Sequence, residues 1–184
     1  MDSTIKGSSF MEQCRTMTAA ELFDPTNGVD FSQFGLILVR GVPGSGKSTL
    51  AQKIKKAMET EQDSLWAAET FETDAWFEKN GGYNVAKLGA AHSATQHNVN
   101  RALLRGVTCI VANTFTREFE LAPYLNMTRQ FTCCHTLIID VYTQFGNVHG
   151  VPAEHVEKMK RRFVPVDHLK FSDAFEFEGV KIYA

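Results

Sequence analysis

The chain has 184 residues, of which 43% are hydrophobic and 22% are charged, and its formal net charge is -2. This length suits one compact domain, and the composition is that of an ordinary globular protein. A charge so close to zero provides no overall field to recruit nucleic acid or an anionic membrane, so a nucleic-acid substrate would need a local basic patch.

The termini and the cysteines give little sign of export. The amino terminus lacks a signal-peptide layout, and no stretch reaches the ~18 apolar residues of a membrane helix, so we expect no membrane partner. Cys14, Cys109, Cys133 and Cys134 contain no CxxC pair. We interpret them as reduced thiols of a cytoplasmic protein without a structural metal, because a zinc site with His135 would have the wrong ligand spacing.

The first elements predict a strand, a glycine-rich loop and a helix. Residues 1–33 are polar and lack sustained periodicity, so we treat them as an N-terminal extension before a domain at 34–184. The apolar run 36–39 is typical of a buried strand. After the loop, apolar residues from Leu50 onward repeat at the spacing of an amphipathic helix.

Strands and helices then alternate along the rest of the chain. We expect strands at 65–71, 107–113 and 135–142, with one more in the alternating segment 175–183. Helices are expected at 85–104, at 117–129 and from Pro152 onward. This alternation predicts an α/β fold, a three-layer sandwich with a central, mainly parallel sheet. Ligands of such sheets bind outside the carboxyl ends of the strands.

The loop itself carries a phosphate-binding motif. Residues 41–48 read GVPGSGKS and satisfy GxxxxGK[ST], with a predicted strand before them and a helix after them. Glycines let the backbone aim its N–H groups at phosphate oxygens, and the helix adds its positive end. We therefore expect a kinase-like P-loop NTPase with ATP and Mg²⁺ as cofactors, although no motif distinguishes ATP from GTP. The expected nucleotide-binding residues are Gly41, Gly44, Ser45, Gly46, Lys47, Ser48 and Thr49, with Lys47 on the β- and γ-phosphates and Ser48 on the metal.

A kinase also needs a base for the attacking hydroxyl. Asp74 comes just after the second predicted strand, and its carboxylate suits that role. Helix capping or turn formation is the alternative for the same side chain.

Several segments together resemble a known family. They are LILVRGVPGSGKSTLA, ETDAWF, GGYN, AAH with RALLRG, IVANTF and NVHGVPAEHVEKMKRRF, and they cover about residues 35–163. The chain resembles the P-loop kinase domain of the NEDD4-binding-protein type, which is similar to phage polynucleotide 5′-hydroxyl kinases. The resemblance implies that Lys47 and Asp74 are catalytic, that Asn113 and Thr114 form a polar pair near the phosphates, and that residues 142–162 form a lid over ATP.

Three positions depart from that family. Phe77 replaces an arginine three residues after the base, Ala112 replaces an acidic residue of the third strand, and Phe145-Gly146 replace an arginine pair of the lid. Other arginines would have to supply positive charge to the moving phosphoryl group. The candidates are Arg161 and Arg162 on the lid helix, Arg117 beside the polar pair as a substrate contact, and Arg40 before the loop.

These candidates have plainer alternatives. Arg161 and Arg162 are adjacent, so at most one faces ATP, and both suit a solvated helix end. Arg40 is as well interpreted as a surface residue at a strand end. Asp140 could help to position magnesium or form a turn, and His92 could face the acceptor or be structural.

The leading hypothesis is an ATP- and Mg²⁺-dependent kinase that transfers the γ-phosphate to a hydroxyl. By resemblance alone, the best acceptor is a nucleic-acid 5′-hydroxyl, and a small-molecule hydroxyl remains open. One alternative is a sugar-nucleotide kinase of the zeta-toxin type, which has a similarly placed aspartate. The other is a nucleotide-binding regulatory module with little transfer activity, which the missing arginines and Ala112 would permit.

Overall fold

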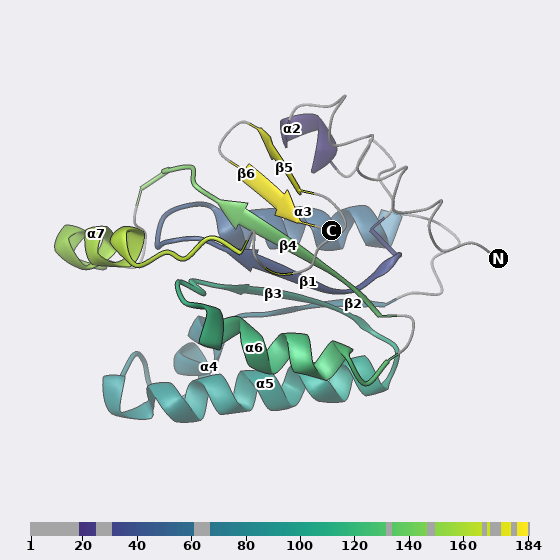
Figure 1. Ribbon diagram of the computed structural model, residues 1–184. Helices are drawn as coiled ribbons and strands as arrows, with labels where there is room; N and C mark the ends of the chain where they lie inside the picture. The colour runs from purple at the N-terminus through teal and green to yellow at the C-terminus, as the bar shows by residue number, and fades with distance from the viewer. Residues whose placement is uncertain are drawn as a thin grey trace.

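A central sheet organises the molecule in the computed structural model, which describes residues 19–24, 31–60, 67–131, 134–146, 150–166, 169, 174–177 and 180–183. Within these residues the sheet has six strands in the order β2-β3-β1-β4-β6-β5 (Figure 1). The strands are β1 (Phe34–Arg40), β2 (Ala68–Phe71), β3 (Thr108–Asn113), β4 (His135–Val141), β5 (Ala174–Phe177) and β6 (Val180–Tyr183).

Four neighbouring strands of this sheet are parallel. β1 pairs in parallel with β3 and β4, and β2 pairs in parallel with β3. These strands are apolar because helices cover both faces, and every residue of β3 is buried. The α/β class and the mainly parallel sheet are therefore confirmed.

The carboxyl-terminal strands differ from the sequence prediction. In place of one strand at 175–183, β5 and β6 form an antiparallel pair, and β6 lies antiparallel to β4. The single-strand interpretation was wrong because a glycine between two alternating runs is typical of a hairpin.

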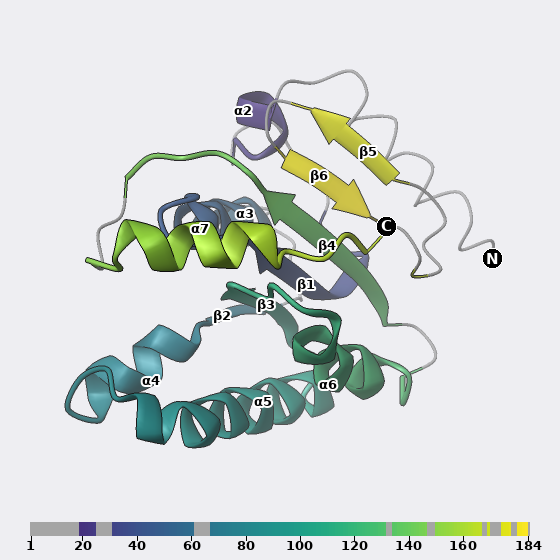
Figure 2. The same cartoon turned by 60° about the vertical axis from the view of Figure 1, so that its left-hand side comes forward.

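Helices lie on both faces of the sheet, with α3 on one face and α5 and α6 on the other (Figures 1 and 2). None of the helices that the described residues form has the length and apolar character needed to cross a membrane. The helices are α2 (Ala19–Leu22), α3 (Lys47–Thr60), α4 (Thr73–Lys79), α5 (Leu88–Leu104), α6 (Glu118–Thr128) and α7 (Ala153–Arg161), with a 3-10 turn η1 (Val85–Lys87).

The alternation of side chains along β1 divides the core in two. Ile37 and Val39 belong to the cluster with α3, whereas Leu36 and Leu38 belong to the cluster with α5 and α6. The first cluster also contains Leu22, Phe23 and Phe31. The stretch that we treat as an extension thus supplies core residues where it is described, and its residues 1–18 and 25–30 lie outside the described residues.

The carboxyl ends of β1, β3 and β4 lie side by side. In the pairing register, Arg40 at the end of β1 stands opposite Asn113 of β3 and Asp140 of β4. The loops that follow these strands therefore meet at one edge of the sheet, as expected for a ligand site of this fold. Figure 2 shows α7 and α4 at the same end of the molecule.

Candidate functional site

The glycine-rich loop connects β1 to α3 and packs tightly against β4. Gly44 and Gly46 have φ angles of 81° and 90°, which favour glycine. A Cβ atom on Gly41 would clash with Ser45 Oγ and would lie 2.7 Å from the carbonyl oxygen of Val141. The loop therefore needs glycine for its backbone path and for its close approach to the end of β4.

Lys47 stands at the first position of α3 with its side chain 8% exposed. Burial lowers the pKa of its ammonium group from the usual value of 10.5, and the carboxylates of Asp74 and Glu72 oppose that change. The lysine of the loop and the predicted base therefore lie within electrostatic reach of each other, although 27 positions separate them in the sequence.

Ser48 has a carboxylate partner that sequence reasoning missed. Its hydroxyl donates a hydrogen bond to Glu72 Oε2 over 2.9 Å. Glu72 directly follows β2 and precedes α4, and its side chain is half-buried. The available signal was an acidic residue at a strand end, two positions before the predicted base. The hydroxyl and the carboxylate are the hard oxygen donors that Mg²⁺ prefers, so the residues present fit this ion.

Asp74 lies in the first turn of α4, a helix that the sequence did not predict, and its side chain is exposed. The start of the helix is held from another strand, because the backbone N–H of Thr73 donates to Asn113 Oδ1 over 2.9 Å. The Thr73 hydroxyl also lies 3.4 Å from His92 Nδ1 on α5. Asp74 is therefore presented from a helix end fixed by β3 and α5.

The polar pair Asn113 and Thr114 lies at the carboxyl end of β3, at the same edge of the sheet. Asn113 is 7% exposed, and its Nδ2 amino group has no hydrogen-bond partner among the described residues. Thr114 is half-buried. Phe115 then takes a φ of 41°, an unusual conformation for a residue with a side chain. Arg117 follows with an exposed side chain, and its backbone N–H donates to Glu120 over 2.8 Å.

The segment after β4 lies on the glycine-rich loop. The Thr143 hydroxyl donates to the carbonyl oxygen of Ser45 over 2.6 Å, and the Phe145 N–H donates to that of Gly44 over 2.9 Å. The Phe145 ring is 78% exposed and would lie 3.0 Å from a Cβ atom on Gly46. The first part of the predicted lid therefore contacts the loop directly. Residues 147–149 of the lid lie outside the described residues.

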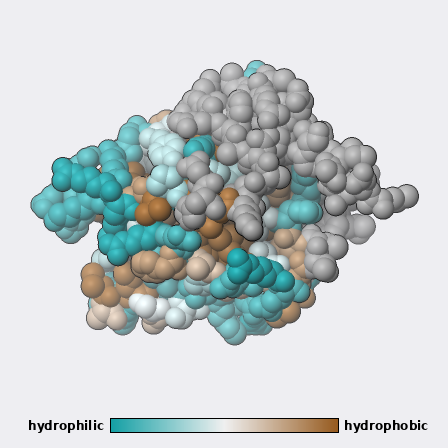
Figure 3. All heavy atoms as spheres, viewed as in Figure 1, coloured by the Kyte–Doolittle hydropathy of each residue, from teal (hydrophilic) through white to brown (hydrophobic). Residues whose placement is uncertain are grey.

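The other end of the predicted lid is attached to the turn after β3. Arg162 Nε donates to the Thr116 hydroxyl over 3.0 Å, and the Val164 N–H donates to the carbonyl oxygen of Thr116 over 3.0 Å. Arg161 is exposed, and Val156 is the buried residue of α7. Figure 3 shows a largely hydrophilic surface where α7 projects from the molecule. The contact of either arginine with ATP stays a prediction.

Arg40 and Asp140 have a different role from those considered in the sequence. Both side chains are 0% exposed, and Arg40 Nε lies 2.7 Å from Asp140 Oδ1. Arg40 also donates to the carbonyl oxygen of Val164 over 2.6 Å and lies 4.2 Å from the ring centroid of Phe163, while the Tyr142 hydroxyl donates to Asp140 over 3.1 Å. The surface interpretation of Arg40 and the magnesium role of Asp140 were therefore wrong, because each buried charge neutralises the other.

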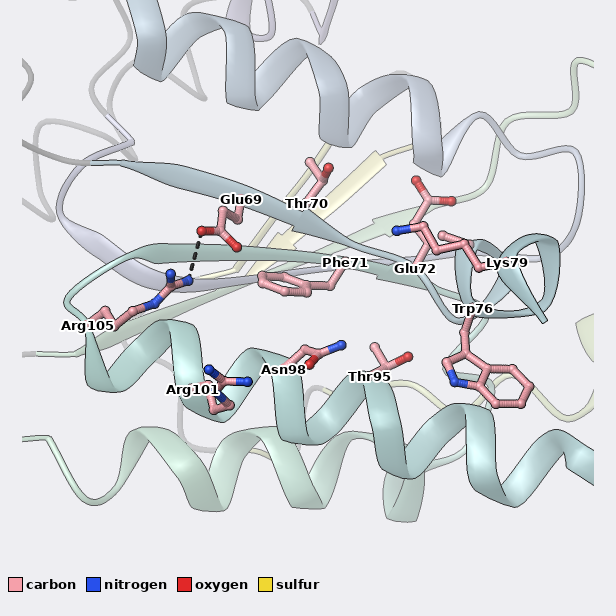
Figure 4. Close-up of a pocket in the computed structure, with 11 residues that line it drawn as sticks. Glu69, Thr70, Phe71, Glu72, Trp76, Lys79, Thr95, Asn98, Arg101 and Arg105 are labelled. Carbon is pink, nitrogen blue, oxygen red and sulfur yellow. Dashed lines mark hydrogen bonds and ion pairs between the residues drawn. The ribbon is translucent and has the colours of Figure 1, made fainter.

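A cavity of about 400 Å³ lies beside the edge strand β2, between it and α5 (Figure 4). Glu69 and Arg105 form an ion pair of 2.9 Å at its border. α4 lines it through Ala75, Trp76 and Lys79 but not through Asp74. Successive residues of a helix point about 100° apart, so Asp74 lies on another face of α4. Glu72 also lines this cavity, and it accepts the hydrogen bond of Ser48. The cavity therefore borders the candidate site at Glu72.

The family of the chain follows from sequence comparison. The profile of the AAA domain family matches residues 36–144, more than half of the chain. The chain therefore belongs to this family, with a kinase-like P-loop fold. It is also similar to human NEDD4-binding protein 2, with 31% identity over 157 residues, which cover 77% of this chain and 8% of that protein. The resemblance seen in the motifs is thus confirmed, although this chain spans only a small part of its relative.

Two solved structures are similar to parts of this chain. A Chloroflexus aurantiacus protein, described provisionally as a kinase, has 20% identity and a TM-score of 0.45 over 61% of each chain. A chain of the Pnkp1/Rnl/Hen1 complex has 19% identity and a TM-score of 0.43 over 80% of this chain and 44% of that chain.

Proposed function

We propose that this protein transfers the γ-phosphate of ATP, in the presence of Mg²⁺, to a hydroxyl group. The observation that carries the proposal is the 2.9 Å hydrogen bond from Ser48 to Glu72, which joins the glycine-rich loop to the segment that presents Asp74 two residues later. A phosphate-binding lysine and an exposed carboxylate at one site are the parts that phosphoryl transfer to a hydroxyl requires.

Each residue has a role that follows from its position. The loop amides and Lys47 would bind the phosphate oxygens, and Ser48 would hold Mg²⁺. The bound ion would offset the charge that develops on the phosphoryl oxygens. Asp74 orients the acceptor hydroxyl and accepts its proton, which its exposed position allows. Asn113 fixes the helix start next to Asp74 through Thr73.

The missing family arginines require substitutes. Phe77 is buried, with its ring centroid 5.4 Å from that of Trp76 and 5.1 Å from that of Tyr83, so its place in the core is apolar. We assign the positive charge instead to Arg117 and to one of Arg161 and Arg162. Arg117 comes after β3, and Arg161 and Arg162 come after β4, so these arginines belong to segments that leave the same edge of the sheet. The Arg162 side chain is held there by its hydrogen bond to Thr116.

The acceptor is proposed from resemblance. A polynucleotide 5′-hydroxyl fits the family that the ETDAWF and NVHGVP segments resemble. A cytoplasmic setting is proposed with it, because Cys109 and Cys134 are free thiols in the part of the chain that the structure describes.

The test is transfer of labelled γ-phosphate from ATP with Mg²⁺ to a panel of acceptors. The panel contains 5′-hydroxyl DNA and RNA oligonucleotides, a base-hydroxymethylated DNA, nucleosides and a UDP-sugar. Lys47→Ala serves as the blank, because it removes the phosphate-binding ammonium group. We expect label in a 5′-hydroxyl oligonucleotide and none with the blank. Label in the UDP-sugar alone would support the zeta-toxin type of reaction, and nucleotide binding without any labelled acceptor would favour a regulatory module.

A further inference from the structure

Glu72 sits at the start of α4 but does not cap it. It occupies the N-cap position with extended backbone angles, and its side chain makes no capping hydrogen bond. Glutamate is not among the preferred capping residues, and here Asn113 supplies the oxygen for the helix instead. The Glu72 carboxylate is turned to the first turn of α3, where it accepts the hydroxyl proton of Ser48.

This hydrogen bond determines which part of the Ser48 hydroxyl group is available to a metal ion. A serine hydroxyl has one proton and two lone pairs. Because the proton is donated to Glu72 over 2.9 Å, the lone pairs remain free to bind a cation. A carboxylate next to that oxygen adds negative charge and can accept protons from water molecules on the ion. Mg²⁺ usually keeps several of its waters, so such an acceptor suits it.

The other carboxylates at this edge are used elsewhere or are missing. P-loop proteins pair the loop serine with an acidic residue at a neighbouring strand end. In β3 that end reads Ala112-Asn113, and Ala112 is buried. Asp140 of β4 is paired with Arg40. In the described part of the chain, no group of three or more His, Cys, Asp or Glu side chains could hold a metal alone, so nucleotide phosphates must supply further ligands.

We propose that Glu72 is the magnesium-side carboxylate of this site. It positions the Ser48 oxygen and accepts hydrogen bonds from the waters of the ion, and Asp74 is left for the acceptor hydroxyl. The two acidic residues of the Glu72-Thr73-Asp74 segment therefore have different roles, one at the metal ion and one at the acceptor hydroxyl. Glu72 takes the place of the acidic residue that β3 lacks at Ala112. This inference rests on the proposed function, because it takes Ser48 as the magnesium ligand.

The experiment measures metal affinity without any acceptor. Binding of Mn²⁺, as a spectroscopic substitute for Mg²⁺, to the full chain saturated with ADP is followed by electron paramagnetic resonance. Glu72→Gln keeps an oxygen that can accept from Ser48 but removes the charge. We expect its Kd for Mn²⁺ to rise about 10- to 100-fold, the usual cost of losing a group that supports a metal ligand. ADP binding without metal should be unchanged or tighter, which also shows that the variant is folded.

Two further variants make the result specific. Glu69→Gln removes a carboxylate from β2, the strand just before Glu72, where Glu69 pairs with Arg105. This variant should bind Mn²⁺ like the wild type. Asp74→Asn should also leave the Kd for Mn²⁺ within about threefold. Wild-type metal affinity in Glu72→Gln, or a loss in Asp74→Asn in its place, would overturn the assignment. If Glu72→Gln fails to fold, Glu72→Asp gives the same test, with a smaller loss expected because the carboxylate is kept but withdrawn.

The outcomes separate this inference from the proposed function. If metal affinity depends on Glu72 but no acceptor is phosphorylated, the metal assignment stands and the kinase proposal fails. If an acceptor is phosphorylated and metal affinity is independent of Glu72, the kinase proposal stands and the assignment of Glu72 fails.

Discussion

At Lys47, burial and two carboxylates act on the charge of one ammonium group. Burial has the larger effect, so the pKa of Lys47 lies below 10.5. The negative charges of Asp74 and Glu72 offset only part of this lowering. A bound phosphate adds negative charge next to the ammonium and favours its protonated form. Nucleotide binding should therefore move the pKa of Lys47 upward from its lowered value in the free protein.

The first prediction is proton uptake on nucleotide binding at alkaline pH. Between the lowered pKa of the free protein and the higher pKa of the complex, the complex holds more protons, so affinity falls as pH rises through that window. Below the pKa of the free protein, affinity should be constant. Isothermal titration calorimetry of ADP in two buffers of different ionisation enthalpy measures the uptake. Equal enthalpies in both buffers across the alkaline range would contradict this account of Lys47.

At the scale of elements, α4 is a helix of seven residues whose start is tied to β3. Such a short helix is marginal by itself and depends on tertiary contacts. The hydrogen bond from the Thr73 N–H to Asn113 Oδ1 is therefore expected to fix the orientation of Asp74.

The second prediction concerns that hydrogen bond. Asn113→Ala should cost about 1 kcal/mol of unfolding free energy, as the loss of a helix cap does. It should also lower kcat more than it raises the Kd for ATP. Urea denaturation and transfer kinetics measure both effects, and equal stability of Asn113→Ala and wild type would exclude this capping role.

The third prediction concerns the attachment of the segment after β4 to the glycine-rich loop. The Thr143 hydroxyl donates to the Ser45 carbonyl oxygen over 2.6 Å. Thr143→Val removes the donor with little change in shape, so it should weaken ATP binding by about 5- to 10-fold, equivalent to roughly 1 kcal/mol for one hydrogen bond. Thr143→Ser retains the hydroxyl and should bind nearly as the wild type. If Thr143→Val binds ATP as tightly as Thr143→Ser, this contact does not order the loop.

The elements that sequence predicted are those with local signals. Continuous apolar runs predicted β1, β3 and β4, and a motif in a short window predicted the loop before α3. α4 was missed because its cap, Asn113, lies 40 positions away. The roles of Glu72 and Arg40 were missed for the same reason, because their partners Ser48 and Asp140 come from other elements. The partners in each of these contacts are distant in the sequence and become neighbours only through the order of the strands in the sheet, which the sequence did not provide.

At the scale of the whole molecule, one buried ion pair joins the two central strands to the segment after α7. Arg40 of β1 contacts Asp140 of β4, and its guanidinium also holds the carbonyl oxygen of Val164 and faces the ring of Phe163. Burial lowers the pKa of Arg40, and Asp140 opposes that change. Arg40, for which the sequence left a phosphate-side role and a surface position open, is therefore a central part of the fold.

The fourth prediction is that Arg40→Met destabilises the whole domain. It leaves Asp140 charged and buried without its partner, which typically costs about 3–5 kcal/mol of unfolding free energy. Replacing both residues, as in Arg40→Met with Asp140→Leu, should restore part of that loss because no charge remains buried. Urea denaturation of the single and double variants measures the difference. A single variant as stable as the wild type would show that the pair does not stabilise the fold.

If Asp74 and the glycine-rich loop form one phosphoryl-transfer site, the exchange Asp74→Asn should remove transfer without weakening ATP binding. Transfer of labelled γ-phosphate to a 5′-hydroxyl oligonucleotide and the Kd for ATP are measured with the wild type, Asp74→Asn and the control Glu78→Gln, an exposed residue one turn further along α4. We expect Asp74→Asn to lower transfer by about 10²- to 10⁴-fold while its Kd for ATP stays within about threefold. Transfer by Asp74→Asn at the rate of Glu78→Gln would contradict this expectation.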